Sequence, residues 1–224
     1  MPVESREPQN EGTLTGAFRE VLGKLIQRTD DLLPASVVAY DRALNRATVQ
    51  PLIQVVDTDG NFINRAQKTN VPVLVLGGGG FLVSFDLPAG SLGWIKANDR
   101  DISLFLQEYS LQPPNTKRMH SFEDGLFIPD IMRDYSIASE DEQAAVIQST
   151  DGSVKISLTA ERIKLTGPAI EIMGPTSITG NTTITGNADI SGTITNGSLN
   201  LTTHNHTQPN DSNGNTEMPT SGPQ

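Results

Sequence analysis

Residues 174–206 read GPTSITGNTTITGNADISGTITNGSLNLTTHNH, and the interpretation of the whole chain starts from this stretch. Isoleucine recurs every six residues, at Ile178, Ile184 and Ile190, while Asp189 is the only charged residue and no aromatic residue occurs. Six is a multiple of the two-residue period of an extended strand, so the three isoleucines face the same way. Short repeats of this kind are typical of β-helices and other solenoids of stacked strands.

A single chain with this repeat does not bury its own isoleucines. A β-helix with six-residue faces needs about three hexads for one coil and several coils for a core. This stretch has only three regular hexads and a less regular continuation at Ile194 and Leu199. Three parallel chains around one axis are the simplest closed solution, because every isoleucine then lies on the axis and no sheet edge is left open. The sequence therefore predicts an obligate homotrimer with an intertwined β-helical shaft.

The repeat ends in two histidines one residue apart, His204 and His206. On an extended strand both side chains point to the same side, here towards the axis. Two imidazoles from each of three chains make six nitrogen ligands, which suits octahedral iron, nickel or cobalt better than zinc with its usual four ligands. A pair of solvated histidines in a polar tail is the alternative. The position at the end of an axial repeat favours the metal site.

Composition separates the chain into two parts. All eleven aromatic residues lie at or before Tyr135, so a conventional core is expected only in the first part. The 16 Lys and Arg residues against 26 Asp and Glu residues give a formal net charge of −10, which disfavours nucleic acid and anionic lipid as partners. There is no cysteine and hence no disulfide. We expect no signal peptide, and the longest apolar stretch, residues 71–76, is far too short to span a membrane.

The first residues predict a polar arm followed by an amphipathic helix. From Leu14 to Ile26 apolar residues fall at helical spacing, with Thr13 or Thr15 as the N-cap, and the helix should end near residues 28–31. The sequence does not decide whether this helix packs on the following domain or docks to a neighbouring protein, and packing on the domain is the more ordinary expectation.

Residues 35–131 predict a small barrel of short strands. The expected strands are 37–40, 47–56, 71–76, 81–85, 92–97 and 102–106, with turns at 41–46 and 57–61. Short strands with glycine-rich corners favour an OB-like barrel. The four glycines Gly77–Gly80 lack the Lys-Ser/Thr of a phosphate loop, so we interpret them as a barrel corner or bulge.

A group of polar residues near His120 allows more than one interpretation. His120 with Glu123 and Asp124 forms a conceivable metal or acid–base group, but a lone loop histidine is more often structural, and we expect no catalysis.

After the acidic connector 139–143 the sequence predicts short alternating strands with inward-facing apolar residues. These residues are Val146, Val154, Ile156, Leu158, Ile163, Leu165, Ile170 and Ile172. Residues 207–224 are either disordered or folded back over the metal site.

Several segments together resemble a known family. They are LPASVVAYDRALNRATVQPLI (33–53), GSLGWIKANDRD (90–101), HSFEDGLFIPD (120–130), the isoleucine repeat and THNHTQPNDSNGNTEMPTSGPQ (203–224). In this order they resemble the central membrane-puncturing spike of contractile-tailed phages, the baseplate assembly protein V-like family.

The resemblance implies a mainly β trimer with four parts. These are an N-terminal arm and amphipathic helix (1–33), an OB-like barrel domain (34–138), a trimeric β-helical shaft (139–203) and an apex with the H-x-H motif (204–224). It also implies one iron per trimer, held at the tip by His204 and His206 of each chain. The N-terminal region would attach to tail hub or baseplate proteins.

The implied function is mechanical. Sheath contraction would drive the spike through the host outer membrane, with which it makes transient contact, and no reaction would be catalysed. The protein would be assembled in the host cytoplasm and located at the tail tip of the virion. The alternatives are a trimeric hexapeptide-repeat enzyme, which needs more complete coils per chain, a receptor-binding tail fibre or adhesin, and a nucleic-acid-binding OB domain.

Overall fold

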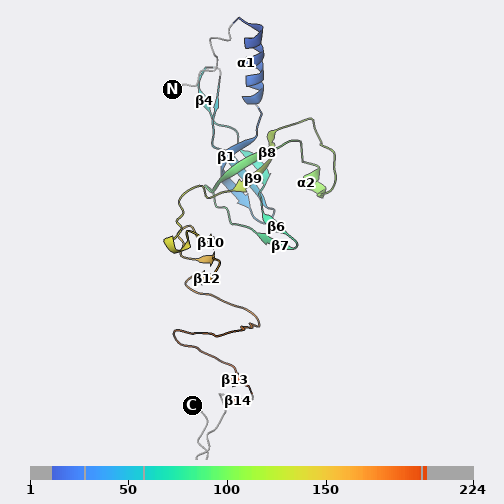
Figure 1. Ribbon diagram of the computed structural model, residues 1–224. Helices are drawn as coiled ribbons and strands as arrows, with labels where there is room; N and C mark the ends of the chain where they lie inside the picture. The colour runs from blue at the N-terminus through green and yellow to red at the C-terminus, as the bar shows by residue number, and fades with distance from the viewer. Residues whose placement is uncertain (1–11, 28, 58, 198, 201–224) are drawn as a thin grey trace, which may run out of the picture. The chain divides into compact units, whose positions relative to one another are not determined.

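The computed structural model describes residues 12–27, 29–57, 59–197 and 199–200. The chain divides after Ile170 into two units, and each is treated by itself below. The described chain is mainly β with an N-terminal helix, as the sequence predicts (Figure 1). Within the described residues, each helix is either too short or too polar to cross a bilayer.

Helix α1 spans Leu14–Gln27. Thr13 is its N-cap, because the Thr13 hydroxyl accepts a hydrogen bond from the Gly16 N–H at 3.0 Å and the Thr13 carbonyl accepts one from the Ala17 N–H at 3.0 Å. The predicted helix is therefore confirmed. Its apolar side chains lie exposed along the helix rather than packed on the barrel.

Five antiparallel strands form the central sheet. They are β1 (Leu32–Asp41), β2 (Arg46–Pro51), β5 (Lys68–Pro72), β8 (Leu92–Asn98) and β9 (Ser121–Pro129), in the spatial order β5-β2-β1-β8-β9. The two outer strands then meet. Val73 forms a parallel bridge with Phe127, and the Leu74 N–H donates to the Phe127 carbonyl at 2.8 Å. The sheet is thereby curled into a nearly closed barrel, and the β1–β2 hairpin confirms the predicted turn at 41–46.

The barrel interior holds small and aromatic apolar side chains. The fully buried members are Ala35, Val37, Ala47, Val49, Val71, Val73, Leu87, Ile95, Ala97, Phe122 and Phe127. They alternate with outward-facing residues along each strand, as a sheet with one buried face requires. Gly93 on β8 lies against β9. A Cβ atom at Gly93 would lie 2.4 Å from the Ile128 carbonyl oxygen and 2.5 Å from the Phe127 ring.

Two small hairpins extend from the barrel. Strands β3 (Val55–Val56) and β4 (Phe62–Ile63) pair across the predicted turn, where the Asp57 carboxylate accepts the Asn61 N–H at 2.8 Å. Strands β6 (Leu76–Gly78) and β7 (Phe81–Val83) pair across Gly79 and Gly80, both of which have positive φ. Two positive φ values in succession make the tight turn typical of β-hairpins. Gly77 and Gly78 therefore lie on β6, and Gly79 and Gly80 form a hairpin turn in place of the predicted barrel corner or bulge.

The predicted strand at 102–106 is wrong. This segment is a helical turn that leads into helix α2 (Phe105–Glu108). The cause is Asp101, whose carboxylate accepts the Ser103 N–H at 2.9 Å and so turns the backbone. The Leu106 N–H then donates to the Ile102 carbonyl at 3.0 Å.

After the barrel, the 3-10 turn η2 (Ser139–Asp141) precedes a three-stranded antiparallel sheet, β10 (Ala145–Gln148), β11 (Lys155–Leu158) and β12 (Ile163–Thr166). These strands pair with one another within the chain. In the second unit, residues 171–194 contain no strand, and a short hairpin follows, β13 (Thr195–Asn196) with β14 (Leu199–Asn200). The predicted intertwined β-helix is not seen in this single chain.

Candidate functional site

The predicted metal ligands His204 and His206 lie outside the described residues. Among the residues that the structure does describe, no three His, Cys, Asp or Glu side chains come together as a metal site. The described chain nevertheless presents another candidate site, made of apolar surface.

The sheet β10–β12 carries its apolar side chains on the exposed face. Ile147 pairs with Ile156, Ile156 with Leu165, and Leu158 with Ile163. These five side chains are between 40% and 72% exposed. Contiguous apolar surface of this kind marks protein–protein contact sites in soluble proteins.

The opposite face of the same sheet is polar and covered. Lys155 and Ser157 are buried there against η2, whose Asp141 carboxylate is 1% exposed. Lys155 Nζ forms an ion pair with Asp141, and Ser157 Oγ donates to Asp141 Oδ1 at 2.6 Å. Glu140 accepts from Lys155 Nζ at 3.2 Å and from Lys164 Nζ at 2.9 Å. The charged side is thus closed by the chain itself, and the apolar side is the one left open.

The electrostatics of this polar face follow from its contacts. The hydrogen bond from Lys155 is the largest cause that lowers the pKa of Asp141, and Ser157 adds to it. The same bond to Asp141 raises the pKa of Lys155 against the cost of desolvation. Both groups are therefore charged at neutral pH, so the pair fastens η2 to β11.

The hexad repeat is also present in the backbone. The φ angles of Gly174, Gly180 and Gly186 are 123°, 127° and 126°, in a region of backbone conformation that residues other than glycine rarely adopt. Each glycine precedes one of the isoleucines of the repeat by four residues. Those isoleucines, at positions 178, 184 and 190, are 68%, 63% and 54% exposed. The chain therefore repeats its conformation every six residues and leaves the apolar ladder uncovered.

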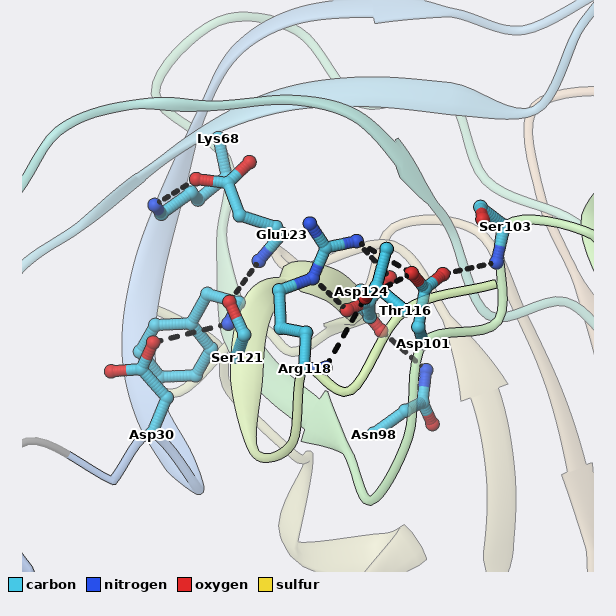
Figure 2. A network of polar contacts seen from close by, with 11 residues as sticks. Asp30, Lys68, Asn98, Asp101, Ser103, Thr116, Arg118, Ser121, Glu123 and Asp124 are labelled. Carbon is cyan, nitrogen blue, oxygen red and sulfur yellow. Dashed lines mark hydrogen bonds and ion pairs between the residues drawn. The ribbon is translucent and has the colours of Figure 1, made fainter. Parts of the chain in front are cut away.

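A second polar cluster lies on the barrel (Figure 2). Arg118 donates to both oxygens of Asp124, at 2.6 and 2.9 Å, and lies 3.4 Å from Asp101. Asp101 also accepts hydrogen bonds from the Ser103 N–H at 2.9 Å and from the Thr116 hydroxyl at 2.7 Å. Hydrogen bonding from Ser103, and then from Thr116, holds the pKa of Asp101 far below its ordinary value. The cluster fixes the long connection between β8 and β9.

The sequence grouping of His120, Glu123 and Asp124 is not brought together. His120 Nε2 lies 3.1 Å from Asp99, Glu123 pairs with Lys68 at 2.6 Å, and Asp124 is held by Arg118. An open cavity of about 500 Å³ next to this cluster is lined by Arg118, Glu123 and Asp124, whose charges are already paired. The arrangement provides no acid–base pair aimed at a substrate.

Sequence reasoning missed parts of both sites. Val146 was expected among the inward apolar residues, but it pairs with Ser157 and lies on the polar face, whereas its neighbour Ile147 belongs to the apolar face. The ion pair between Asp141 and Lys155 joins residues fourteen apart, and no local pattern announces it. The alternation of Lys155 and Ser157 with apolar residues in VKISL (154–158) was the available signal.

Uncovered apolar faces of this kind are typical of proteins that contact other chains. Residues 33–130, from the start of the barrel to its last strand, match the family model of the phage protein Gp138 N-terminal domain. This match supports a structural phage protein of the baseplate type, and hence a component of the virion. No curated protein gives a significant match to the chain.

Proposed function

We propose that this protein is the central spike of a contractile phage tail, a homotrimer that pierces the host outer membrane when the sheath contracts. The proposal rests chiefly on one observation, the open apolar face of β10–β12 followed by the exposed isoleucine ladder. Both surfaces lie on consecutive parts of the chain. Copies of the same chain that run side by side would cover both at once.

We propose three chains because three rows of isoleucines can close around one axis. The isoleucines at 178, 184 and 190 form a single row, and residues 171–194 have no strand partner within the described chain. Three such rows around an axis bury every isoleucine and pair the backbone between chains. Two rows would leave sheet edges open to solvent.

The barrel would attach the spike to the tail hub. Its strand order, with the first three strands as a meander and the third closing on the fifth, supports an OB-like barrel. The hairpins β3–β4 and β6–β7 expose apolar side chains, with Phe62 at 62% and Phe81 at 83%. Such surface suits coverage by hub or baseplate proteins.

The mechanical role fits the chemistry of the shaft. Around the isoleucines the repeat consists mainly of Thr, Ser, Asn and Gly, with Ala188 and Asp189 as the exceptions, so the outside of a trimeric shaft would have no large apolar patch to hold it in lipid. Strands shared among three chains load many backbone hydrogen bonds together. We propose no catalytic step for this protein.

The tip would hold one iron per trimer. Neutral imidazoles from His204 and His206 of three chains form a six-nitrogen donor set, which fits an octahedral ion. Such an ion would join three chain ends, where fraying otherwise begins.

Sedimentation, metal analysis and electron microscopy of tails test this function together. The spike predicts a trimer with about one iron per three chains, located on the axis of the baseplate. A tail fibre or adhesin would instead lie at the baseplate periphery. A hexapeptide-repeat enzyme would bind an acyl donor such as acyl-CoA, and either result would contradict the proposal.

A further inference from the structure

Helix α1 carries an apolar stripe that nothing in the described chain covers. Its six large apolar side chains are between 54% and 76% exposed. They are Leu14, Phe18, Val21, Leu22, Leu25 and Ile26. The spacing of residues 14, 18, 21 and 25 is four, three and four, which is the heptad spacing of a coiled-coil seam. Glu20 and Lys24 pair at 2.8 Å away from the stripe.

The helix needs a partner to be stable. It is 14 residues long and includes Gly16 and Gly23, and helices of this length are marginal in water even without glycine. Its stability must therefore come from packing of the stripe.

The area of the stripe indicates which partner this is. Six side chains of roughly 60–120 Å² each, about two-thirds exposed, offer roughly 250–500 Å² per helix. A stable interface between diffusing partners buries about 800 Å² on each side. The stripe by itself is too small to hold a freely diffusing partner. It suffices for chains that are already held together by another contact, because their effective concentration is about millimolar.

We infer that the α1 helices of three copies associate through this stripe into a parallel three-helix coiled coil. The inference rests on the proposed trimer and adds a second contact, at the N-terminal end of each chain. Leu22 and Ile26 widen the stripe beyond a two-stranded seam, which favours three helices.

Disulfide trapping in the full-length protein tests the inference, since the chain has no cysteine of its own. Val21→Cys places a thiol on the seam, and Gly23→Cys places one on the opposite side of the same helix as the matched control. A disulfide needs Cα atoms within about 7 Å. Under mild oxidation, Val21→Cys should yield cross-linked pairs of chains at a rate that does not change on dilution, at least tenfold faster than the control.

Sedimentation of each variant tests the proposed trimer separately from the proposed α1 contact. A trimer in which Val21→Cys cross-links no faster than Gly23→Cys overturns the α1 contact and leaves the trimer standing. This is also the result expected if α1 docks on the barrel or on another baseplate protein. A folded monomer that does not cross-link overturns both the contact and the trimer.

Discussion

Ile156 faces Leu165 across β11 and β12, and the two side chains are 40% and 49% exposed, whereas Lys155, next to Ile156 in the sequence, is 7% exposed. The usual polarity of a sheet is reversed here, because the charged face is covered and the apolar face is open. Lys155 tolerates burial because Asp141 lies against it. We expect other copies of the chain to pack on this open face.

A charge on the open face should therefore break the proposed trimer. Ile156→Asp or Leu165→Asp would place a carboxylate in the proposed apolar contact, where desolvation is costly. We expect size-exclusion chromatography with light scattering to show monomers or aggregates in place of trimers. Leu111→Asp, at a fully exposed position of the barrel unit, is the control and should leave the trimer intact.

The ion pair under the sheet should contribute to stability with a defined pH dependence. Asp141→Asn removes the main partner of buried Lys155 and should lower the Tm at pH 7. Because the pKa of Asp141 lies below its unfolded value of 3.8, its stabilising effect is fully present above that value and is lost as pH falls through the lower folded pKa.

Thermal melts of the native chain and Asp141→Asn at several pH values check this. The difference in Tm should be constant from about pH 5 to 8 and shrink only in strong acid. A difference that already disappears near pH 6 would show that Asp141 does not act through its charge.

Gly93 should be intolerant of any side chain. Gly93→Ala forces a Cβ against Ile128 and Phe127, and overpacking of this kind costs about 1–3 kcal/mol in free energy of unfolding. Gly78→Ala, with nothing within 4 Å of the added atom, is the matched control and should change stability little. Chemical denaturation followed by Trp94 fluorescence measures both, and equal stability of the two variants would argue against the barrel packing.

The proposed iron site predicts that replacement of its two histidines removes the iron. The double variant His204→Ala/His206→Ala should purify without iron, whereas His120→Ala should retain about one iron per three chains. Since ligand imidazoles must be neutral, protons compete with the metal, and iron should also dissociate in acid. Elemental analysis by mass spectrometry decides, and equal iron in the native and doubly substituted proteins would exclude these ligands.

The sequence predicted those parts of the fold that depend on local chemistry. The turn at 41–46, the Asp57 turn and the Thr13 cap each need only side chains within a few residues of one another, and all three are confirmed. The strand at 102–106 was wrong because the Asp101 carboxylate turns the backbone through the Ser103 N–H, and that carboxylate is also held by Thr116, fifteen residues away, and by Arg118.

In the candidate site, too, local features were predicted and features that depend on long-range contacts were not. The six-residue repeat is visible in the sequence and recurs in the backbone at Gly174, Gly180 and Gly186. The choice between Val146 and Ile147 as the open-face residue depends on which side η2 covers, and that is set by the long-range pairing of Asp141 with Lys155. Alternation alone gives two faces without saying which one is covered.

The mass of the native protein in solution tests the central claim most directly. Sedimentation equilibrium of the full chain should give about three times the 24.1 kDa of one chain, unchanged from micromolar to nanomolar concentration. A folded, soluble species of 24.1 kDa that stays monomeric over this range would contradict the account.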